Sequence, residues 1–222
     1  MLVGLGVWAV YTFRQQAQAL GAFTSPDPQT LPVRITTGPE VQALRDKFNA
    51  FKSLVDRGEA ASLVVTHDEL NILLSGFESL ADIKPLFVVR ELKPDGKFVA
   101  QVSFPLNTLP GQHRYLNGEI DGVIGAHHES GLYIAAQDVR VPGKTVPMGF
   151  KDVYQRGVIP GKSFGFLDDM LLRNFRADPA VSATLRHIRR VSSTTEQLTL
   201  STKAQTKETG DDASLPANDE NR

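Results

Sequence analysis

Hydrophobic residues recur at three- and four-residue steps over residues 41–55, with charged residues between them. This period predicts an amphipathic helix, and Pro39 suits its first turn. A second, short helix is predicted over residues 67–75, because Thr66-x-x-Glu69 has the spacing of a capping box. The folded part of the chain is therefore expected to begin with two helices.

The period then changes from 3.6 to 2, which is typical of strands. Segments 85–92 and 97–106 flank the turn sequence Lys-Pro-Asp-Gly at 93–96 and should form a hairpin. Segments 115–127 and 132–141 alternate in the same way. Together they predict a meander of four antiparallel strands.

Three glycines, Gly118, Gly122 and Gly125, lie within the segment 115–127. Glycine weakens a strand interior and usually marks a bend, a bulge or the close approach of another group. We therefore expect a strongly curved sheet.

Helical periodicity returns at 148–156, 164–176 and 179–188, and residues 190–203 alternate as a Ser/Thr-rich edge strand. The predicted fold class is α+β: a curved antiparallel sheet of about five strands packed with an N-terminal helix, plus a C-terminal helical insertion. This single domain should span residues 39–203.

Residues 1–13 contain no charged side chain and resemble a membrane segment. Thirteen helical residues rise about 20 Å, whereas a bilayer core needs about 20 residues. Trp8, Tyr11 and Arg14 are placed like an interfacial fringe. We expect residues 1–19 to be an N-terminal membrane anchor or signal segment whose start is truncated.

The favoured localisation is the cell membrane, as a single-pass protein with the bulk of the chain extracytoplasmic. One alternative is cleavage near Ala19, since Ala17-x-Ala19 fits a signal-peptidase site and would give a secreted or periplasmic protein. Another is a buried N-terminal helix or strand.

Two further segments lie outside the predicted domain. Residues 20–38 are rich in Pro and Thr and indicate an extended stalk. Residues 204–222 form an acidic tail with little apolar content, which should be disordered.

The composition excludes several kinds of partner and site. The chain has 24 Lys+Arg against 25 Asp+Glu, and this balance argues against a nucleic-acid partner. It has no Cys, which excludes disulfides, a thiol nucleophile and cysteine-ligated metals.

We find no catalytic, cofactor-binding or metal-binding signature. His127 and His128, followed by Glu129, come nearest to a metal cluster, but adjacent strand residues should point to opposite faces. The Gly-Lys-Ser at 161–163 lacks the first glycine of a P-loop. Asp168-Asp169 fits the first turn of a helix, where the dipole favours acidic residues.

Apolar side chains of the predicted sheet and the segment before it could line a groove for a hydrophobic or lipid ligand, or they could form a closed core. The candidates are Phe77, Phe87, Phe98, Phe104, Leu116, Ile120 and Ile124.

The order of elements resembles the YpmS-like family of bacterial membrane-anchored extracytoplasmic proteins. The resemblance rests on the Thr-x-x-Glu-Leu-Asn helix start at 66–71, the glycine-rich strand 115–127 and the segment 138–144, and it covers residues 40–160. It implies a non-catalytic envelope protein, associated with lipid, and brings no catalytic residues.

We therefore expect a non-enzymatic, membrane-anchored envelope domain that contacts the membrane through residues 1–13. It would bind a hydrophobic or lipid ligand or a membrane-protein partner. One alternative is a scaffold or assembly adaptor of the cell envelope, which could use the acidic tail. Another is a hydrolase with dispersed His, Asp and Ser residues.

Overall fold

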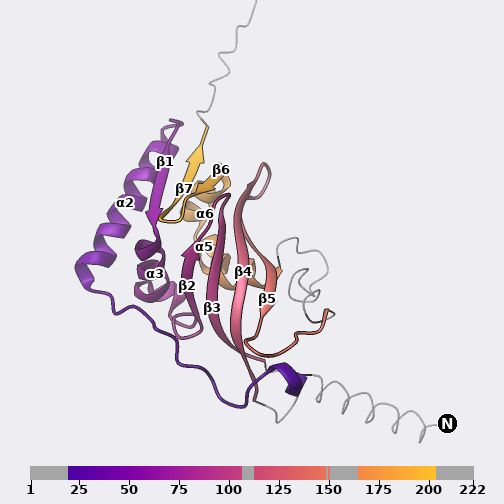
Figure 1. The fold of residues 1–222 in the computed structure, drawn as a ribbon. Helices are drawn as coiled ribbons and strands as arrows, with labels where there is room; N and C mark the ends of the chain where they lie inside the picture. The colour runs from indigo at the N-terminus through magenta and orange to yellow at the C-terminus, as the bar shows by residue number, and fades with distance from the viewer. Residues whose placement is uncertain (1–19, 107–112, 149, 151–164, 204–222) are drawn as a thin grey trace, which may run out of the picture.

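The computed structural model describes residues 20–106, 113–148, 150 and 165–203. These residues form helices and two antiparallel sheets, which confirms the predicted α+β class (Figure 1). The helices are α2 (Gly38–Asp56), α3 (His67–Gly76), the 3-10 helix η1 (Glu78–Leu80), α5 (Gly165–Ala177) and α6 (Pro179–Arg186). The strands are β1 (Ser62–Thr66), β2 (Phe87–Leu92), β3 (Lys97–Pro105), β4 (Tyr115–His127), β5 (Gly131–Arg140), β6 (Ile188–Ser193) and β7 (Gln197–Thr202).

The predicted meander is the larger sheet, with the strand order β2-β3-β4-β5. The inward face of β3 is apolar: Phe98, Ala100, Val102 and Phe104 are at most 3% exposed, and Leu106, just after the strand, is 4% exposed. Helix α5 packs against β5 and α3 packs against β2. In Figure 1, α5 and α6 lie behind this sheet while α2 and α3 flank its β2 edge.

The expectation of one edge strand over residues 190–203 is wrong. The chain turns back at Thr194, whose N–H donates to the Gln197 carbonyl at 2.9 Å, so the segment forms the hairpin β6–β7. Strand β7 is the centre of a second sheet with the order β1-β7-β6. A uniform Ser/Thr alternation conceals this turn, because it contains no Gly or Pro to mark it.

The glycines of β4 do mark curvature and close approach. A Cβ on Gly122 would lie 2.2 Å from the Phe98 ring, and the β4–β5 register shifts between Asp121 and Gly122. A side chain at Gly122 would displace a core aromatic ring. The prediction of bulges and close contacts in this strand is therefore confirmed.

Residues 20–37, which we call the N-terminal strap, are extended over most of their length but lie against the domain. The Phe23 side chain is 1% exposed and the Leu31 side chain 6%. Ser25 pairs with Tyr115 at the start of β4, with N···O distances of 2.9 and 2.7 Å. The strap thus adds a β-bridge to the sheet instead of standing away from it as a stalk.

Two cations hold the start of the strap. The Arg114 guanidinium donates to Thr24 Oγ1, to the Thr24 carbonyl at 3.0 Å and to the Gly21 carbonyl at 3.2 Å. The Lys144 ammonium donates to the same Thr24 carbonyl at 3.0 Å. Arg114 comes just before β4 and Lys144 comes shortly after β5. Because these two strands are antiparallel, both residues lie at the same end of the sheet, and the strap is fixed there.

Among the described residues, no helix has the length and apolar character to cross a membrane. The predicted anchor and cleavage site within residues 1–19, the Gly-Lys-Ser at 161–163 and the acidic tail 204–222 lie outside these residues. Most of the helix expected over 148–156 also lies outside them.

Candidate functional site

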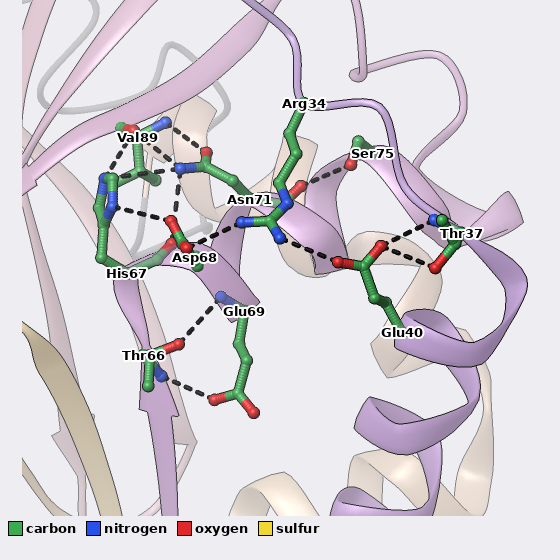
Figure 2. Close-up of polar contacts among 10 residues, drawn as sticks. All are labelled: Arg34, Thr37, Glu40, Thr66, His67, Asp68, Glu69, Asn71, Ser75 and Val89. Atoms are coloured by element: carbon green, nitrogen blue, oxygen red, sulfur yellow. Dashed lines mark hydrogen bonds and ion pairs between the residues drawn. The ribbon is translucent and has the colours of Figure 1, made fainter.

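A group of polar contacts surrounds helix α3, and we call it the α3 polar cluster. It includes side chains from the strap, α2 and α3 and the backbone of β2 (Figure 2). Its members are Arg34, Thr37, Glu40, Lys47, Thr66, His67, Asp68, Glu69, Asn71, Ser75 and Val89.

The capping box predicted at α3 is present. Thr66 Oγ1 accepts from the Glu69 N–H at 3.1 Å, and Glu69 Oε2 accepts from the Thr66 N–H at 2.8 Å. These two bonds satisfy backbone donors that the first turn of a helix leaves without a partner. They also fix the direction in which α3 leaves β1, which brings its first two turns against β2.

Asn71 joins α3 to the edge of the larger sheet. Its side chain is buried, its Nδ2 donates to the Val89 carbonyl at 3.0 Å and its Oδ1 accepts from the Val89 N–H at 3.0 Å. A side-chain amide here supplies one donor and one acceptor, as a neighbouring strand would. Asn71 therefore takes the place of a further strand at this residue of β2.

His67 lies beside the same carbonyl. Its Nε2 is 2.9 Å from the Val89 oxygen, a distance at which the tautomer with the proton on Nε2 donates to that carbonyl. Its Nδ1 is 3.7 Å from Asp68 Oδ1. One ring nitrogen of His67 thus contacts the backbone of β2.

Arg34 connects the strap to two helices. Its guanidinium lies 2.9 Å from Glu40 Oε1 of α2 and 2.8 Å from Asp68 Oδ2 of α3, as Figure 2 shows. Glu40 Oε2 also accepts from the N–H and the hydroxyl of Thr37, both at 2.9 Å. This is a second capping box, at the start of α2.

The contacts of the cluster lower the pKa of two of its glutamates, Glu40 and Glu69. Hydrogen bonds from the Thr37 N–H, the Thr37 hydroxyl and Arg34 lower the pKa of Glu40. Burial raises the pKa of Glu69, but hydrogen bonds from Lys47 and from the Thr66 N–H outweigh it, so the pKa is lowered. Lys47 Nζ lies 2.8 Å from Glu69 Oε1. Both carboxylates are thereby held in the charged form.

The opposite edge of the larger sheet is closed in a similar way. Asp168 is 3% exposed and accepts from the Ile134 N–H of β5 at 3.0 Å. Arg176 pairs with Asp168 and donates to the Leu132 carbonyl at 2.9 Å. Asp168 is in the first turn of α5, as expected, but its burial and partners show that it joins the helix to the sheet edge.

The expectation that His127 and His128 point apart is wrong. Their ring centroids are 4.6 Å apart, because His128 lies in the turn after β4, where strand alternation no longer applies. His128 Nε2 is 3.3 Å from Glu129 Oε1, and the two side chains are 75% and 77% exposed. The described part of the chain nevertheless holds no group of three side chains suited to a metal ion.

Most of the side chains proposed to line a groove lie in the packed core. Phe87, Phe98, Phe104, Leu116 and Ile120 are at most 3% exposed. The rings of Phe87 and Phe98 are 6.2 Å apart, and Ile124 packs against the same core. The groove itself stays a prediction.

Phe77 lies apart from the other groove candidates. The Arg45 guanidinium is 5.4 Å from the centroid of its ring. This distance is typical of a cation–π contact, so one face of the ring faces a charged group.

Comparisons with protein-family models, curated proteins and solved structures give no match for this chain. Its function must therefore be argued from the strap, the α3 polar cluster and the two closed sheet edges.

Proposed function

We propose that this protein is a non-enzymatic, membrane-anchored envelope domain whose partner is a membrane protein. The observation that carries the proposal is the docked strap. Phe23 in the core, the Ser25–Tyr115 bridge and the Arg34 ion pairs fix the strap to the domain from residue 20 onward.

The docked strap sets how far the domain can stand from an anchor. A free strap of residues 20–37 would add about 60 Å of reach, at about 3.3 Å per residue. With the strap docked, only residues 14–19 separate the apolar run 1–13 from the domain, and they span at most about 20 Å. The end of the sheet that carries Tyr115 and Lys144 would then lie beside the bilayer.

The packing of the interior favours a protein partner over a lipid ligand. Five of the seven proposed groove residues are at most 3% exposed, so a bound acyl chain would have to displace packed rings. The polar side chains of the α3 polar cluster make their hydrogen bonds and ion pairs within the protein. Such a cluster fits a rigid domain that presents a surface to a protein partner. The YpmS-like resemblance adds the expectation that the domain faces away from the cytoplasm.

Sided labelling tests the location. The chain has no Cys, so the single variant Glu129→Cys gives one reactive position, at a side chain that is 77% exposed. In intact bacterial cells producing the full chain, we expect a membrane-impermeant maleimide to label it. After fractionation the protein should sediment with the membranes.

A cytoplasmic marker protein with an exposed Cys, which should be labelled only after lysis, is the control for cell integrity. Labelling of Glu129→Cys only after lysis, or a protein found wholly in the soluble fraction, would contradict the proposal. Native mass spectrometry after mild purification distinguishes a lipid ligand from a membrane-protein partner. If the partner is a membrane protein, we expect the purified protein to have the mass of the chain alone. A stoichiometric bound lipid would favour the lipid ligand instead.

A further inference from the structure

Three arginines gather where α6 meets β6, and we call them the arginine patch: Arg186, Arg189 and Arg190. All three are exposed. The β6–β7 register shifts between Ile188 and Arg190, so Arg189 is an extra residue in the strand. This bulge allows two consecutive residues, Arg189 and Arg190, to reach solvent.

Local contacts keep the patch together. The Arg189 guanidinium donates to the Arg186 carbonyl at the end of α6 and to its neighbour, the Ile188 carbonyl, at 3.2 Å. A cation at a helix C-terminus is favourable, so Arg189 has a structural reason for its position. Arg186 and Arg190 have no such contact among those observed.

The patch is not neutralised by the described part of the chain. Five of the other described arginines lie in ion pairs with carboxylates: Arg34, Arg57, Arg140, Arg173 and Arg176. Two more have other partners, since Arg45 lies over the Phe77 ring and Arg114 donates to Thr24. Within the described residues no carboxylate pairs with the three arginines of the patch. Adjacent like charges repel each other, so an anionic group would relieve them.

The acidic tail begins next to these arginines. In the sheet, Thr202 is the partner of Ile188, and Ser201 is the partner of Arg190. The chain therefore enters residues 204–222 one strand away from the patch. This tail has five acidic residues, Glu208, Asp211, Asp212, Asp219 and Glu220, against the two basic residues Lys207 and Arg222.

We propose that the acidic tail of the same chain docks on the arginine patch. Both the opposite charge and the short connection favour this occupant, because the connection gives the tail a high effective concentration at the patch. A docked tail shields the patch, so any other anionic partner has to displace it.

The main competing occupant is a membrane with anionic lipids. The tip of the β4–β5 hairpin reaches the patch, since a Cβ on Gly131 would lie 2.5 Å from Arg186 Cα. The strap is fixed at the other end of β4, whose 13 residues span about 40 Å. If the proposed function holds, the anchoring membrane lies at that far end and away from the patch.

Paramagnetic relaxation tests the tail contact. The chain has no Cys, so a nitroxide attached to Ser214→Cys marks the tail alone. Amide signals are measured on the full chain in neutral detergent micelles. At about 0.01 M salt, where the Debye length is about 30 Å, we expect the amides of 186–190 to lose roughly half their intensity. At about 1 M salt the Debye length is about 3 Å, and the intensity should return.

Two sets of variants are matched controls. Asp211→Asn with Asp212→Asn removes tail charge without changing side-chain shape, and it should abolish the broadening. Arg186→Gln with Arg190→Gln should do the same, while Arg189 is kept because it contacts the end of α6. The unbroadened amides of Tyr115 and Leu116 serve as the reference for a folded chain.

Broadening of 186–190 that is no stronger than that of Leu116, or that persists in the Asn variant, would overturn the proposal. Vesicles of phosphatidylcholine and phosphatidylglycerol test the membrane as occupant. Vesicles of phosphatidylcholine alone are the reference, because a membrane anchor would bind both kinds of vesicle. We expect phosphatidylglycerol to strengthen binding more for the chain ending at Lys203 than for the full chain. An equal gain for both chains would show that the tail does not cover the patch, whether or not the protein is anchored in a membrane.

Discussion

Asn71 is the side chain on which the β2 edge depends most directly. Replacement by Ala would leave the Val89 N–H without its partner, while the Val89 carbonyl would keep His67. A buried backbone donor without a partner costs about 1–3 kcal/mol, and we expect the free energy of unfolding to fall by that amount in Asn71→Ala.

Urea unfolding followed by circular dichroism measures this change. The matched control is Asn49→Ala, at an exposed position of α2, where we expect a change within about 0.5 kcal/mol. Equal midpoints for Asn71→Ala and the native chain would show that the amide does not support the edge.

Two carboxylates of the α3 polar cluster should make stability depend on pH. The pKa values of Glu40 and Glu69 are lowered in the folded chain from an ordinary value of 4.5. As the pH falls through about 4.5, the unfolded chain binds these protons first, so folding stability decreases. Above that pH the contribution is fully present.

Denaturant midpoints at neutral pH and near pH 4 would show this loss. In the double variant Glu40→Gln with Glu69→Gln, we expect a smaller difference between the two midpoints. A difference as large as in the native chain would mean that other groups cause the acid sensitivity.

The sequence predicts part of this residue-level picture. The capping box at Thr66 is visible because its pattern is local, and the same Thr-x-x-Glu pattern at Thr37 could have revealed the one at α2. Asn71 cannot be assigned in this way. Its partner is a backbone unit 18 residues further along the chain, and no side-chain pattern marks which backbone groups a sheet edge leaves open.

At the scale of elements, helices close both edges of the larger sheet. On the β5 edge, Arg176→Ala would leave the Asp168 carboxylate buried without its cation. Breaking a fully buried pair costs about 3–5 kcal/mol, but the Arg176 side chain is 32% exposed, so we expect about 2 kcal/mol.

The same helix supplies a control for that change. Arg173 pairs with Asp169, and its side chain is 68% exposed. Arg173→Ala should therefore cost less than about 0.5 kcal/mol. Equal losses in the two variants, measured by urea unfolding, would show that Asp168 is not an edge contact of special importance.

The strap should open locally while the larger sheet stays folded. Phe23 is 1% exposed, and Phe23→Ala removes the apolar contacts that hold the strap on the domain. We therefore expect the hydrogen-exchange rate of the Ser25 amide to rise at least about tenfold. Hydrogen exchange of the Val102 amide in β3 should stay slow. Ile35→Ala is the control, since Ile35 lies in the same strap and is 91% exposed.

The elements themselves follow well from sequence where their signals are local. The meander and helices α2 and α3 agree with the predicted periods. The hairpin β6–β7 does not, because residues 194–196 carry none of the usual turn residues. The strap was expected as an extended stalk because it is rich in Pro and Thr and lacks helical periodicity, but composition does not show that Phe23 and Leu31 are buried in the domain.

At the scale of the whole molecule, the docked strap decides how the domain would stand on a membrane. It joins the N-terminal segment to one end of the sheet, and the arginine patch lies at the other end of β4. The anchor, the partner and the shielded patch are proposals that share this arrangement. The orientation of the domain on the membrane depends on the strap holding it close to the anchor, whereas the docking of the tail on the patch does not.

Energy transfer to the bilayer tests that claim most directly. The full chain is placed in nanodiscs whose lipids carry an acceptor dye, with a donor on Thr145→Cys near the strap or on Glu129→Cys at the far end of the β4–β5 hairpin. We predict efficient transfer from Thr145→Cys and weak transfer from Glu129→Cys. Equal transfer from both positions, or a chain that does not enter the nanodisc, would contradict the account.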